Sequence, residues 1–519
     1  MAMALKLALG ASILVGVAVL VLFVLGRTVF ALPDARAPEA PIALPASEAG
    51  PLANALRDRI AAHPGRTGVA PLPNGADAFA ARVLLADAAV SSIDAQYYIW
   101  HDDLTGLLLF DALRRAADRG VRVRLLLDDN GTAGIDGIIA ALDAHPMIAV
   151  RLYNPFNLRR PKLLSYALDF PRLNRRMHNK SFTVDGLATV VGGRNVGDEY
   201  FGTGEQPLYV DLDALVVGAV MPEVADDFDR YWAAPAVHAA GPIVGEASEI
   251  DPVAAMLAAR RDDPQLTEYR EAIRASALVA RMAEGALDLE WTDAILVSDD
   301  PAKGEGEVPR DRLLAAALTR AVGEVENRFD GISPYFVPGA RGVEQFAEME
   351  ARGVTVRMLT NSLAATDVLP VHAGYAKRRE AMLKAGVELF ELRREAAPDT
   401  DRGDVGLFGS SGASLHAKTF AVDGRRIYVG SFNFDPRSVH LNTEMGLLID
   451  SPAMAERMHD GFDRGLDGLA WRVERTEDGL AWSDPAASDA PPLRDEPGST
   501  LPRRIALTVI GWLPVEWLL

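Results

Sequence analysis

The sequence contains no cysteine among its 519 residues. Disulfide bonds, thiolate metal sites and a cysteine nucleophile are therefore excluded. Basic residues are also outnumbered, because 53 lysines and arginines stand against 72 aspartates and glutamates, for a formal net charge of −19. A chain with this charge repels nucleic acid and anionic membranes as a whole. Any polyanionic partner must therefore be met by a local basic patch.

One uncharged apolar run lies near the N-terminus, at residues 7–25, between Lys6 and Arg27. A helix of about 20 residues crosses the hydrocarbon layer, whereas the apolar part of a cleaved signal peptide is usually about 7–15 residues long. The run therefore predicts a single-pass transmembrane anchor within residues 1–33, and the alternative is a signal peptide cleaved near Ala37. The Pro- and Ala-rich residues 34–60 are expected to form a linker.

The other end of the chain, residues 483–519, is predicted to be a linker followed by an apolar tail. After Arg503 and Arg504, residues 505–519 carry one charged side chain, Glu516, and two tryptophans. This tail is too short to span a membrane but suits a lipid interface. A terminal strand or helix docked on the protein core is the alternative.

The two halves of the sequence repeat each other. Residues 178–186 (HNKSFTVDG) match residues 416–424 (HAKTFAVDG) at six of nine positions, and the histidines lie 238 residues apart. Upstream, residues 119–126 match residues 352–359 at an offset of 233. A near-constant offset indicates duplicated domains, which we place at residues 61–244 and 310–482, with residues 245–309 as a connecting insert.

The pattern within each half predicts an α/β fold. A helix, a strand, a second helix and an apolar buried strand precede each motif, and each motif forms a strand pair that turns at Asp185-Gly186 or Asp423-Gly424. Continuous apolar strands indicate mainly parallel or mixed sheets covered by helices. The two domains are expected to be related by a pseudo-twofold axis and to share one active site.

The His-x-Lys pairs carry the chemistry. Residues i and i+2 of a strand point to the same face, so His178 projects with Lys180, and His416 projects with Lys418. The lysines can hold the oxygens of a phosphodiester while one imidazole attacks phosphorus and the other protonates the leaving alkoxide. Because the lysines supply the electrostatic stabilisation, no metal or cofactor is expected.

Further polar residues are expected to support this pocket. Aligning the strands that follow the motifs places Asp213 opposite Glu444, and we expect these acids to orient the two histidines. Asn195 and Asn433 are expected to bind the phosphoryl oxygens. The motif residues Asp185 and Asp423 are expected to be turn residues or buried ion-pair partners rather than reacting groups. Asp103 or Thr105 is expected to cap the helix that follows.

A basic segment leads into the first motif. Residues 157–180 have a net charge of +6, interleaved with apolar residues. The predicted lipid-surface residues are Arg159, Arg160, Lys162, Arg172, Arg175 and Arg176. A solvated basic face is the alternative to this anionic-lipid docking surface.

Two His-x-Lys-x4-Asp motifs in a duplicated frame resemble the phospholipase D superfamily. Residues 96–105, 174–180, 192–195, 430–437 and 442–444 are similar to bacterial cardiolipin synthases, particularly the C type. The resemblance implies transfer of a phosphatidyl group between phospholipids through a phosphohistidine, with catalytic residues His178, Lys180, Asp185, His416, Lys418 and Asp423. It also implies that His178 is the nucleophile, that His416 is the acid and base, and that the enzyme lies in the bacterial inner membrane. The implied substrates are phosphatidylglycerol and, as an alternative donor, phosphatidylethanolamine.

Two other function classes remain open from the sequence. One is a hydrolase of the same superfamily that acts on phospholipid or, less in keeping with the acidic chain, on nucleic acid. The other is a membrane-tethered binding protein with a degenerate site, against which both intact motifs count. The sequence leaves open the donor lipid, the membrane face of the catalytic domain and the oligomeric state.

Overall fold

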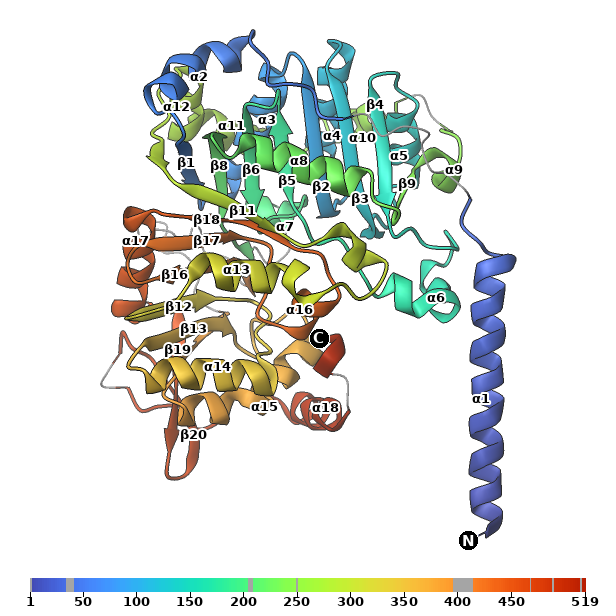
Figure 1. Ribbon diagram of the computed structural model, residues 1–519, viewed down its shortest axis with the longest axis vertical. Helices are drawn as coiled ribbons and strands as arrows, with labels where there is room; N and C mark the ends of the chain where they lie inside the picture. Colours follow the sequence, from blue (N-terminus) through green and yellow to red (C-terminus); the bar gives the residue numbers. More distant parts are fainter. Residues whose placement is uncertain are drawn as a thin grey trace.

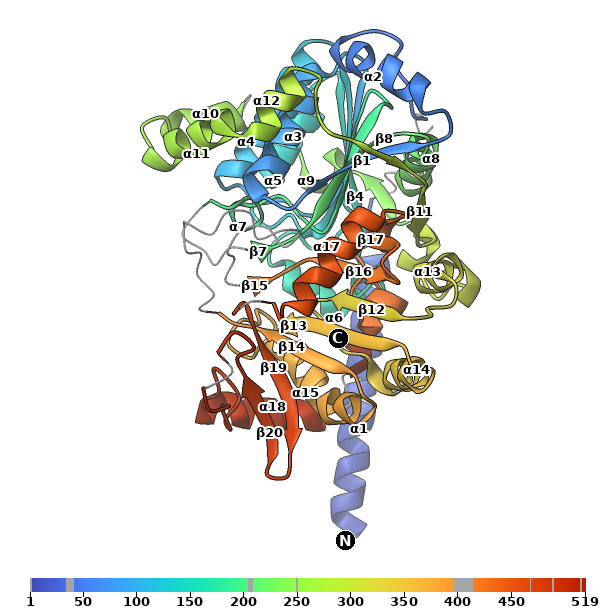
Figure 2. The same cartoon turned by 90° about the vertical axis from the view of Figure 1, so that its left-hand side faces the viewer.

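The computed structural model describes residues 2–33, 42–203, 209–248, 251–394, 414–466, 468–487, 490–513 and 516–519, which contain two nine-stranded sheets. Figures 1 and 2 show the sheets one above the other, each with helices on both faces. The cleavage position considered near Ala37 lies outside the described residues.

The first sheet has the order β10-β1-β8-β6-β5-β2-β3-β4-β9. Its strands are β1 (Thr67–Leu72), β2 (Ser92–Ile99), β3 (Arg122–Gly131), β4 (Ile148–Tyr153), β5 (Ser181–Val184), β6 (Ala188–Gly192), β8 (Asp213–Gly218), β9 (Val237–Ala239) and β10 (Glu290–Thr292). The helices α3 (Gly75–Ala88), α4 (Leu104–Asp118) and α5 (Asp136–Asp143) cover one face, and α8 (Met221–Trp232) covers the other (Figure 2).

The second sheet repeats this order as β11-β18-β17-β16-β12-β13-β14-β19-β20. Its strands are β11 (Ala294–Ser298), β12 (Arg328–Ile332), β13 (Thr355–Asn361), β14 (Glu388–Leu392), β16 (Lys418–Val422), β17 (Arg426–Gly430), β18 (Met445–Ile449), β19 (Ala470–Thr476) and β20 (Gly479–Ser483). The helices α13 (Leu314–Val322) and α14 (Gly339–Ala351) lie on one face and α17 (Pro452–Asp463) on the other, while α15 (Leu369–Lys384) lies beside β14.

The predicted duplicated α/β fold is confirmed, because the strand order β8-β6-β5-β2-β3-β4 recurs as β18-β17-β16-β12-β13-β14. Of the two expected arrangements, mainly parallel or mixed, the structure has the mixed one. Parallel pairing within the two described sheets is limited to β2–β3–β4 and β12–β13–β14, and the motif hairpins add antiparallel strands to each. The sheets are therefore mixed.

A shared apolar cluster joins the two halves. It contains Val191 and Ala214 from the first sheet together with Val429 and Leu447 from the second, all fully buried. Burial of apolar side chains is the main force that holds such an interface together. The cluster lies beside the ends of the motif strands, so it fixes the position of one motif relative to the other.

The insert is part of both domains rather than a simple connection. Its helices α10 (Pro252–Ala259), α11 (Pro264–Ala275) and α12 (Ala277–Ala283) pack on the first domain. Its strands β10 and β11, separated by Asp293, form an edge strand of the first and of the second sheet, respectively. The insert thus ties the two sheets together.

The two ends of the chain are helical. The apolar N-terminal run forms α1 (Ala2–Thr28), and α2 (Pro51–Ala62) begins inside the predicted linker, so the prediction of a linker was wrong from Pro51 onward. Pro51 opens α2, and the buried Ala53 and Leu56 attach it to the domain. Within the part of the chain that the structure describes, no helix has the length and apolar character of a membrane span. The predicted anchor is therefore not confirmed. The C-terminal tail forms α18 (Leu501–Trp512), which docks on α15.

The remaining elements are short. They are β7 (Tyr209–Val210), β15 (Ser414–Leu415), α6 (Ser165–Leu173), α7 (Asp198–Phe201), α9 (Gly241–Val244) and α16 (Pro436–His440), with 3-10 turns at Lys162–Leu164, Pro301–Gly304, Arg310–Arg312 and Glu516–Leu518. The pair β7–β15 is parallel and joins the two halves next to His416.

Candidate active site

Each motif histidine lies just before its strand and is hydrogen-bonded through its backbone to the opposite half. The His178 amide donates to the Thr443 carbonyl over 2.8 Å, and the His416 amide donates to the Val210 carbonyl over 2.8 Å. Thr443 and Val210 are each followed directly by an acidic residue. The backbone pairing therefore brings each histidine beside an acid from the other domain.

These acids bind the histidine side chains. Nδ1 of His178 lies 2.7 Å from Oε2 of Glu444, and Nδ1 of His416 lies 2.6 Å from Oδ2 of Asp211. With Nδ1 of each ring held by a carboxylate, Nε2 is the nitrogen that remains for substrate. Each imidazole is thus oriented by a residue of the opposite half.

The prediction of Asp213 as a histidine partner was wrong. Asp213 accepts a hydrogen bond from Nη2 of Arg82 over 2.9 Å, at the start of β8. The sheet registers explain the error, because Gly192 pairs with Asp213 while the equivalent Gly430 pairs with Gly446. The residue two positions earlier is Asp211 in the first half and Glu444 in the second. Counting from the paired strands would have identified Asp211.

The two motif lysines are buried, and each contacts the backbone of its motif histidine. Nζ of Lys180 donates to the His178 carbonyl over 2.6 Å, and Nζ of Lys418 donates to the His416 carbonyl. Burial lowers the pKa of Lys180 to about 7 and that of Lys418 to about 8, although nearby carboxylates oppose this shift. A phosphodiester anion bound beside the two lysines would favour their charged forms, so the pocket is suited to an anionic ligand.

Burial and the neighbouring lysine charges lower the pKa of both imidazoles, that of His178 well below its usual value. Burial raises the pKa of Glu444 to about 7, against the charge of Lys180 and the hydrogen bonds of two serines. Burial would also raise the pKa of Asp211, but the charges of His416 and Lys418 outweigh it and hold that pKa well below its usual range. A neutral His178 is the form that can act as a nucleophile.

Glu444 is supported by Ser438 of the second domain and by Asp299 of the insert, neither of which was predicted from the sequence. Oγ of Ser438 donates to Oε1 of Glu444 over 2.8 Å, and the Glu444 amide donates to Oδ2 of Asp299 over 2.9 Å. Nζ of Lys303 donates to the same Asp299 oxygen over 2.8 Å. Asp299 and Lys303 are buried and four residues apart. In the sequence, only this spacing indicated that the two residues could form an ion pair.

The two asparagines differ in their surroundings. Oδ1 of Asn195 accepts from the Ile99 amide, and its Nδ2 donates to the Tyr200 hydroxyl over 3.0 Å. The Tyr200 ring packs 5.0 Å from the His416 ring, so Asn195 positions a wall of the pocket. Oδ1 of Asn433 is buried without a hydrogen-bond partner in the described part of the chain. Asn433 therefore retains a buried acceptor, which suits a hydrogen-bond donor rather than a phosphoryl oxygen.

The motif aspartates are structural. Asp185 has φ 54° and its carboxylate accepts from the amides of Val90, Ser91 and Ser92. Asp423 has φ 53° and accepts from the amides of Glu326, Asn327 and Arg328. Asp tolerates this left-handed backbone better than most residues. Each aspartate fixes the turn of its motif hairpin to the start of the neighbouring strand in the sheet, β2 or β12, which explains its place in the pattern.

The predicted basic lipid surface is wrong as a set. Arg159 and Lys162 bind Asp129, Arg172 binds Asp169, and the buried Arg176 binds Asp128. Arg175 donates to the carbonyls of Lys303 and His440. Of the six, Arg160 alone is exposed. The side chains of this segment that project into solvent are instead the apolar Leu163, Leu164 and Phe170.

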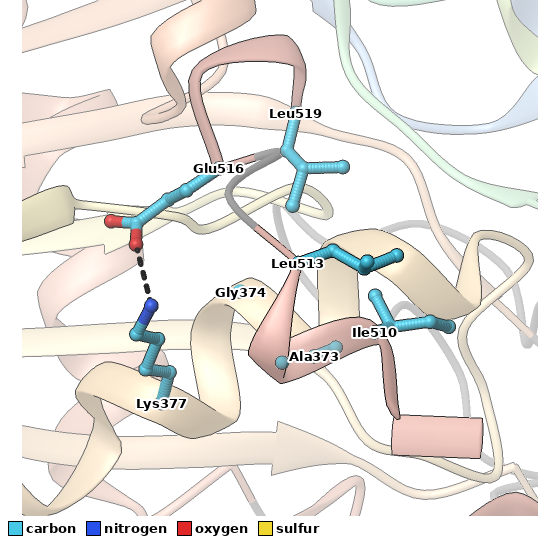
Figure 3. A pocket seen from close by; sticks show the side chains of 8 residues that line it. Ala373, Gly374, Lys377, Ile510, Leu513, Glu516 and Leu519 are labelled. Carbon is cyan, nitrogen blue, oxygen red and sulfur yellow. Dashed lines mark ion pairs between the residues drawn. The ribbon is translucent and has the colours of Figure 1, made fainter. Parts of the chain in front are cut away.

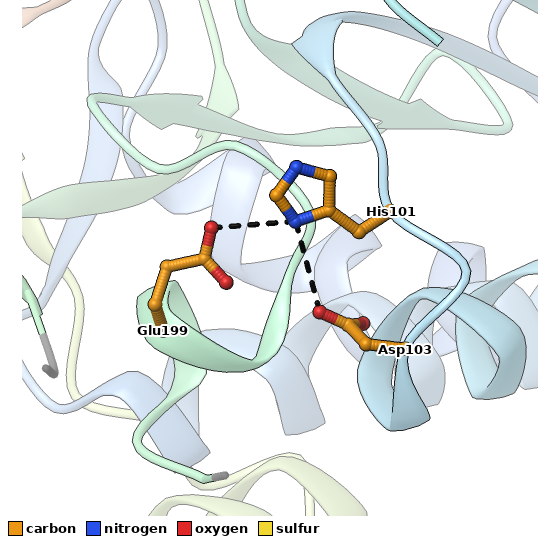
Figure 4. A group of neighbouring side chains, drawn as sticks. All are labelled: His101, Asp103 and Glu199. Atoms are coloured by element: carbon orange, nitrogen blue, oxygen red, sulfur yellow. Dashed lines mark ion pairs between the residues drawn. The ribbon is translucent and has the colours of Figure 1, made fainter. Parts of the chain in front are cut away.

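One cluster near the site has the residue types of a metal centre. Ligand atoms of His101, Asp103 and Glu199 lie within 4.8 Å of one another (Figure 4). Asp103, however, caps α4 by accepting from the Gly106 amide over 3.0 Å and accepts from the Asp198 amide over 2.7 Å. This confirms the predicted cap. The carboxylate is thus already engaged in holding two segments of the chain together.

The chain was compared with known proteins. A family model described as cardiolipin synthase, PLD-like domain, matches residues 84–232 and 318–466. Cardiolipin synthase C of Escherichia coli K12 is 48% identical over 471 residues, which cover 90% of this chain and 99% of that protein. An uncharacterized protein of Helicobacter pylori 26695 is 31% identical over 419 residues, covering 79% of this chain and 81% of that protein.

A solved structure shares the fold. Phosphatidylserine synthase of Haemophilus influenzae aligns with a TM-score of 0.55 and 15% sequence identity, covering 89% of this chain and 99% of that one. The two-domain arrangement is therefore found in a second protein of distant sequence.

Proposed function

Since the chain belongs to the cardiolipin synthase family of phospholipase D-like proteins, we propose that it is a phosphatidyltransferase that makes cardiolipin from phosphatidylglycerol and a second phospholipid. The observation that carries the proposal is the pair of crossed contacts, His178–Glu444 and His416–Asp211, together with the buried Lys180 and Lys418 of the same motifs. The donor is a second phosphatidylglycerol or phosphatidylethanolamine.

In the first step, Nε2 of His178 attacks the phosphorus of the donor. A nitrogen–phosphorus bond forms, the bond from phosphorus to the headgroup oxygen breaks, and His416 gives that oxygen its proton. In the second step, a hydroxyl of phosphatidylglycerol attacks the phosphohistidine and passes its proton to His416. The nitrogen–phosphorus bond breaks, cardiolipin leaves and His178 is regenerated. We assign these roles to the two histidines by their resemblance to the family.

The remaining residues act on the phosphoryl group or on the rings. Lys180 and Lys418 balance the charge of the phosphoryl oxygens. Glu444 and Asp211 fix the tautomer of the two imidazoles and stabilise the positive charge that forms on them.

Transfer rather than hydrolysis requires that water be kept from the phosphohistidine. His178 and His416 are only 6% and 5% exposed, which favours an acceptor delivered from lipid. A well-oriented hydroxyl reaches an effective molarity of about 10⁵ M or more, far above the roughly 55 M of water. The burial of both histidines therefore supports transfer over the hydrolase alternative.

The test is a product analysis of the purified protein in mixed micelles. With phosphatidylglycerol alone, or with added phosphatidylethanolamine, we expect cardiolipin to exceed phosphatidic acid, and the variant His178→Ala to form neither. If phosphatidic acid dominates at saturating acceptor, the protein is a phospholipase.

We also propose that the protein works at the bacterial inner membrane, attached through the apolar helix α1. The support is the uncharged run at residues 7–25. Carbonate extraction of membranes should retain the full chain, whereas deletion of residues 1–33 should release it. Equal extraction of both would refute attachment through α1.

A further inference from the structure

The helix α18 displays apolar side chains to solvent along one face. Leu501, Ile505, Val509 and Trp512 are spaced by four, four and three residues, which places them on one side of a helix. Leu501 is 72% exposed and Trp512 is 81% exposed, and Trp517, beyond the helix, is 57% exposed. A surface helix of a soluble protein normally turns polar residues outward, so this face is unusual.

The opposite side of α18 is also apolar, and it packs on α15. Figure 3 shows the small pocket between them, lined by Ala373, Gly374, Lys377, Ile510, Leu513 and Leu519, among others. Arg503, Arg504 and Thr508 are the polar side chains of α18, and apolar side chains lie on both its inner and its outer side. Because α15 covers only the inner side, the outer side requires a second apolar environment.

Polar contacts on both flanks hold the helix rigidly in this position. Before α18, Glu496 binds Nε2 of His372 over 2.7 Å and also pairs with Arg379. After it, Glu516 binds Arg378 over 2.8 Å. The position of α18, and with it the exposed face, is therefore fixed by contacts with the second domain.

The tail also reaches the segment that leads to the active site. The Arg437 amide and Nε donate to the carbonyls of Leu519 and Leu518, over 2.8 and 2.9 Å. Nη2 of the same guanidinium donates to Oδ1 of Asn174 over 2.6 Å. Asn174 lies four residues before His178, so one side chain connects the tail to the nucleophile's segment.

We propose that the outer face of α18 and Trp517 dock into the interfacial region of a lipid bilayer and bring the active site to its substrates. The proposal rests on the proposed function for the choice of lipid as occupant. Tryptophan is favoured at this interface. Residues 494–519 contain three basic side chains, Arg494, Arg503 and Arg504, and three acidic ones, Asp495, Glu496 and Glu516. The tail therefore carries no net charge from these side chains, and Arg504 on α18 is paired with Asp495, so we expect the docking surface to bind by apolar burial.

The absence of cysteine from the sequence permits a local test. The full chain carrying Val509→Cys is labelled with an environment-sensitive fluorophore and mixed with phosphatidylcholine vesicles, some containing lipids with a quencher near the headgroup. The matched control is Val90→Cys, because Val90 is 46% and Val509 50% exposed. We expect a blue shift and quenching at position 509 and neither at position 90, at low and high salt alike.

Three results would overturn the proposal. They are no change at position 509, an equal change at position 90, or a change at position 509 that follows protein concentration without vesicles, which would mean that a second copy covers the face. A kinetic arm separates docking from catalysis. The variant Ile505→Gln/Val509→Gln/Trp512→Gln should lose at least tenfold in transfer on vesicle substrates but retain transfer on short-chain monomeric phospholipids. Equal loss on both would contradict docking, whereas absence of transfer by the unmodified protein would refute only the proposed function.

Discussion

Glu444, in the second half of the chain, holds Nδ1 of His178, in the first half, at 2.7 Å. The reverse contact joins His416 to Asp211 of the first half at 2.6 Å. Each motif histidine therefore takes its acidic partner from the other domain. The duplication produces one active site at the domain interface.

The variants Glu444→Gln and Asp211→Asn should each reduce kcat by roughly 10²–10⁴-fold, because the imidazole loses the group that fixes its tautomer. Thermal unfolding and product formation are measured together. Asp213→Asn is the matched control, because it leaves the buried Arg82 without its carboxylate partner and should cost about 3–5 kcal/mol of stability. If Asp213→Asn impaired kcat in the folded protein as severely as Asp211→Asn, the assignment of Asp211 would be contradicted.

His178→Ala and His416→Ala should each nearly abolish turnover, because both imidazoles serve one phosphoryl group. Two independent sites would instead leave about half the activity in either variant. Acid-quenched samples with labelled donor lipid should show a protein-bound phosphatidyl adduct in His416→Ala and none in His178→Ala. The opposite pattern would exchange the two roles.

Asp185→Ala and Asp423→Ala should destabilise the fold rather than the chemistry. Each substitution removes a carboxylate that accepts several backbone amides and places alanine at a positive φ. We expect a loss on the order of 3 kcal/mol in unfolding free energy, since hydrogen bonds to charged groups contribute about 1.5–3 kcal/mol each. Transfer per folded molecule, measured below the melting temperature, should stay within a few-fold of the unmodified protein. A selective loss of kcat with unchanged stability would show that these two aspartates act in catalysis.

The value of kcat/KM should fall as the pH rises, with the last part of the fall between about 7 and about 8. Lys180 and Lys418 must be protonated to bind the phosphodiester, and their pKa values are lowered to about 7 and about 8. His416 must also be protonated to release the headgroup oxygen, and because its pKa is lowered from the usual value, loss of this proton begins the fall before the lysines titrate. The acid limb should lie well below pH 6.5, because the lowered pKa of His178 keeps this nucleophile neutral there. Residual activity of Lys418→Arg should lose part of the alkaline fall, since arginine keeps its charge. A flat profile up to pH 9 would contradict this role of the lysines.

Transfer should survive dialysis against EDTA, because two lysines stand where a metal would otherwise stabilise the phosphoryl group. His101→Ala tests the single cluster of metal-ligand type among the described residues and should leave the response to EDTA unchanged. Loss of activity on dialysis, with rescue by a divalent cation in the unmodified protein but not in His101→Ala, would establish a metal site at that cluster.

The sequence by itself determined the duplication, the α/β class and the four residues His178, Lys180, His416 and Lys418. These features follow from local periodicity and from a repeated pattern, and both can be read from the order of residues without knowledge of long-range contacts. It also indicated the turn role of Asp185 and Asp423, because Asp-Gly between two apolar runs specifies a hairpin whatever the rest of the fold does.

Only the tertiary structure decided which acid serves which histidine. A strand register that slips by two residues leaves the same side chains on the same face, so Asp211 and Asp213 are equivalent in pattern. In the fold, Asp213 contacts Arg82 of its own domain and Asp211 contacts His416 of the other. The charge of residues 157–180 was likewise visible in sequence, but the carboxylates of Asp128 and Asp129 reach this segment only through the folding of the first domain. The contacts between the motif histidines and the acids of the opposite half exist only once the two sheets are packed together.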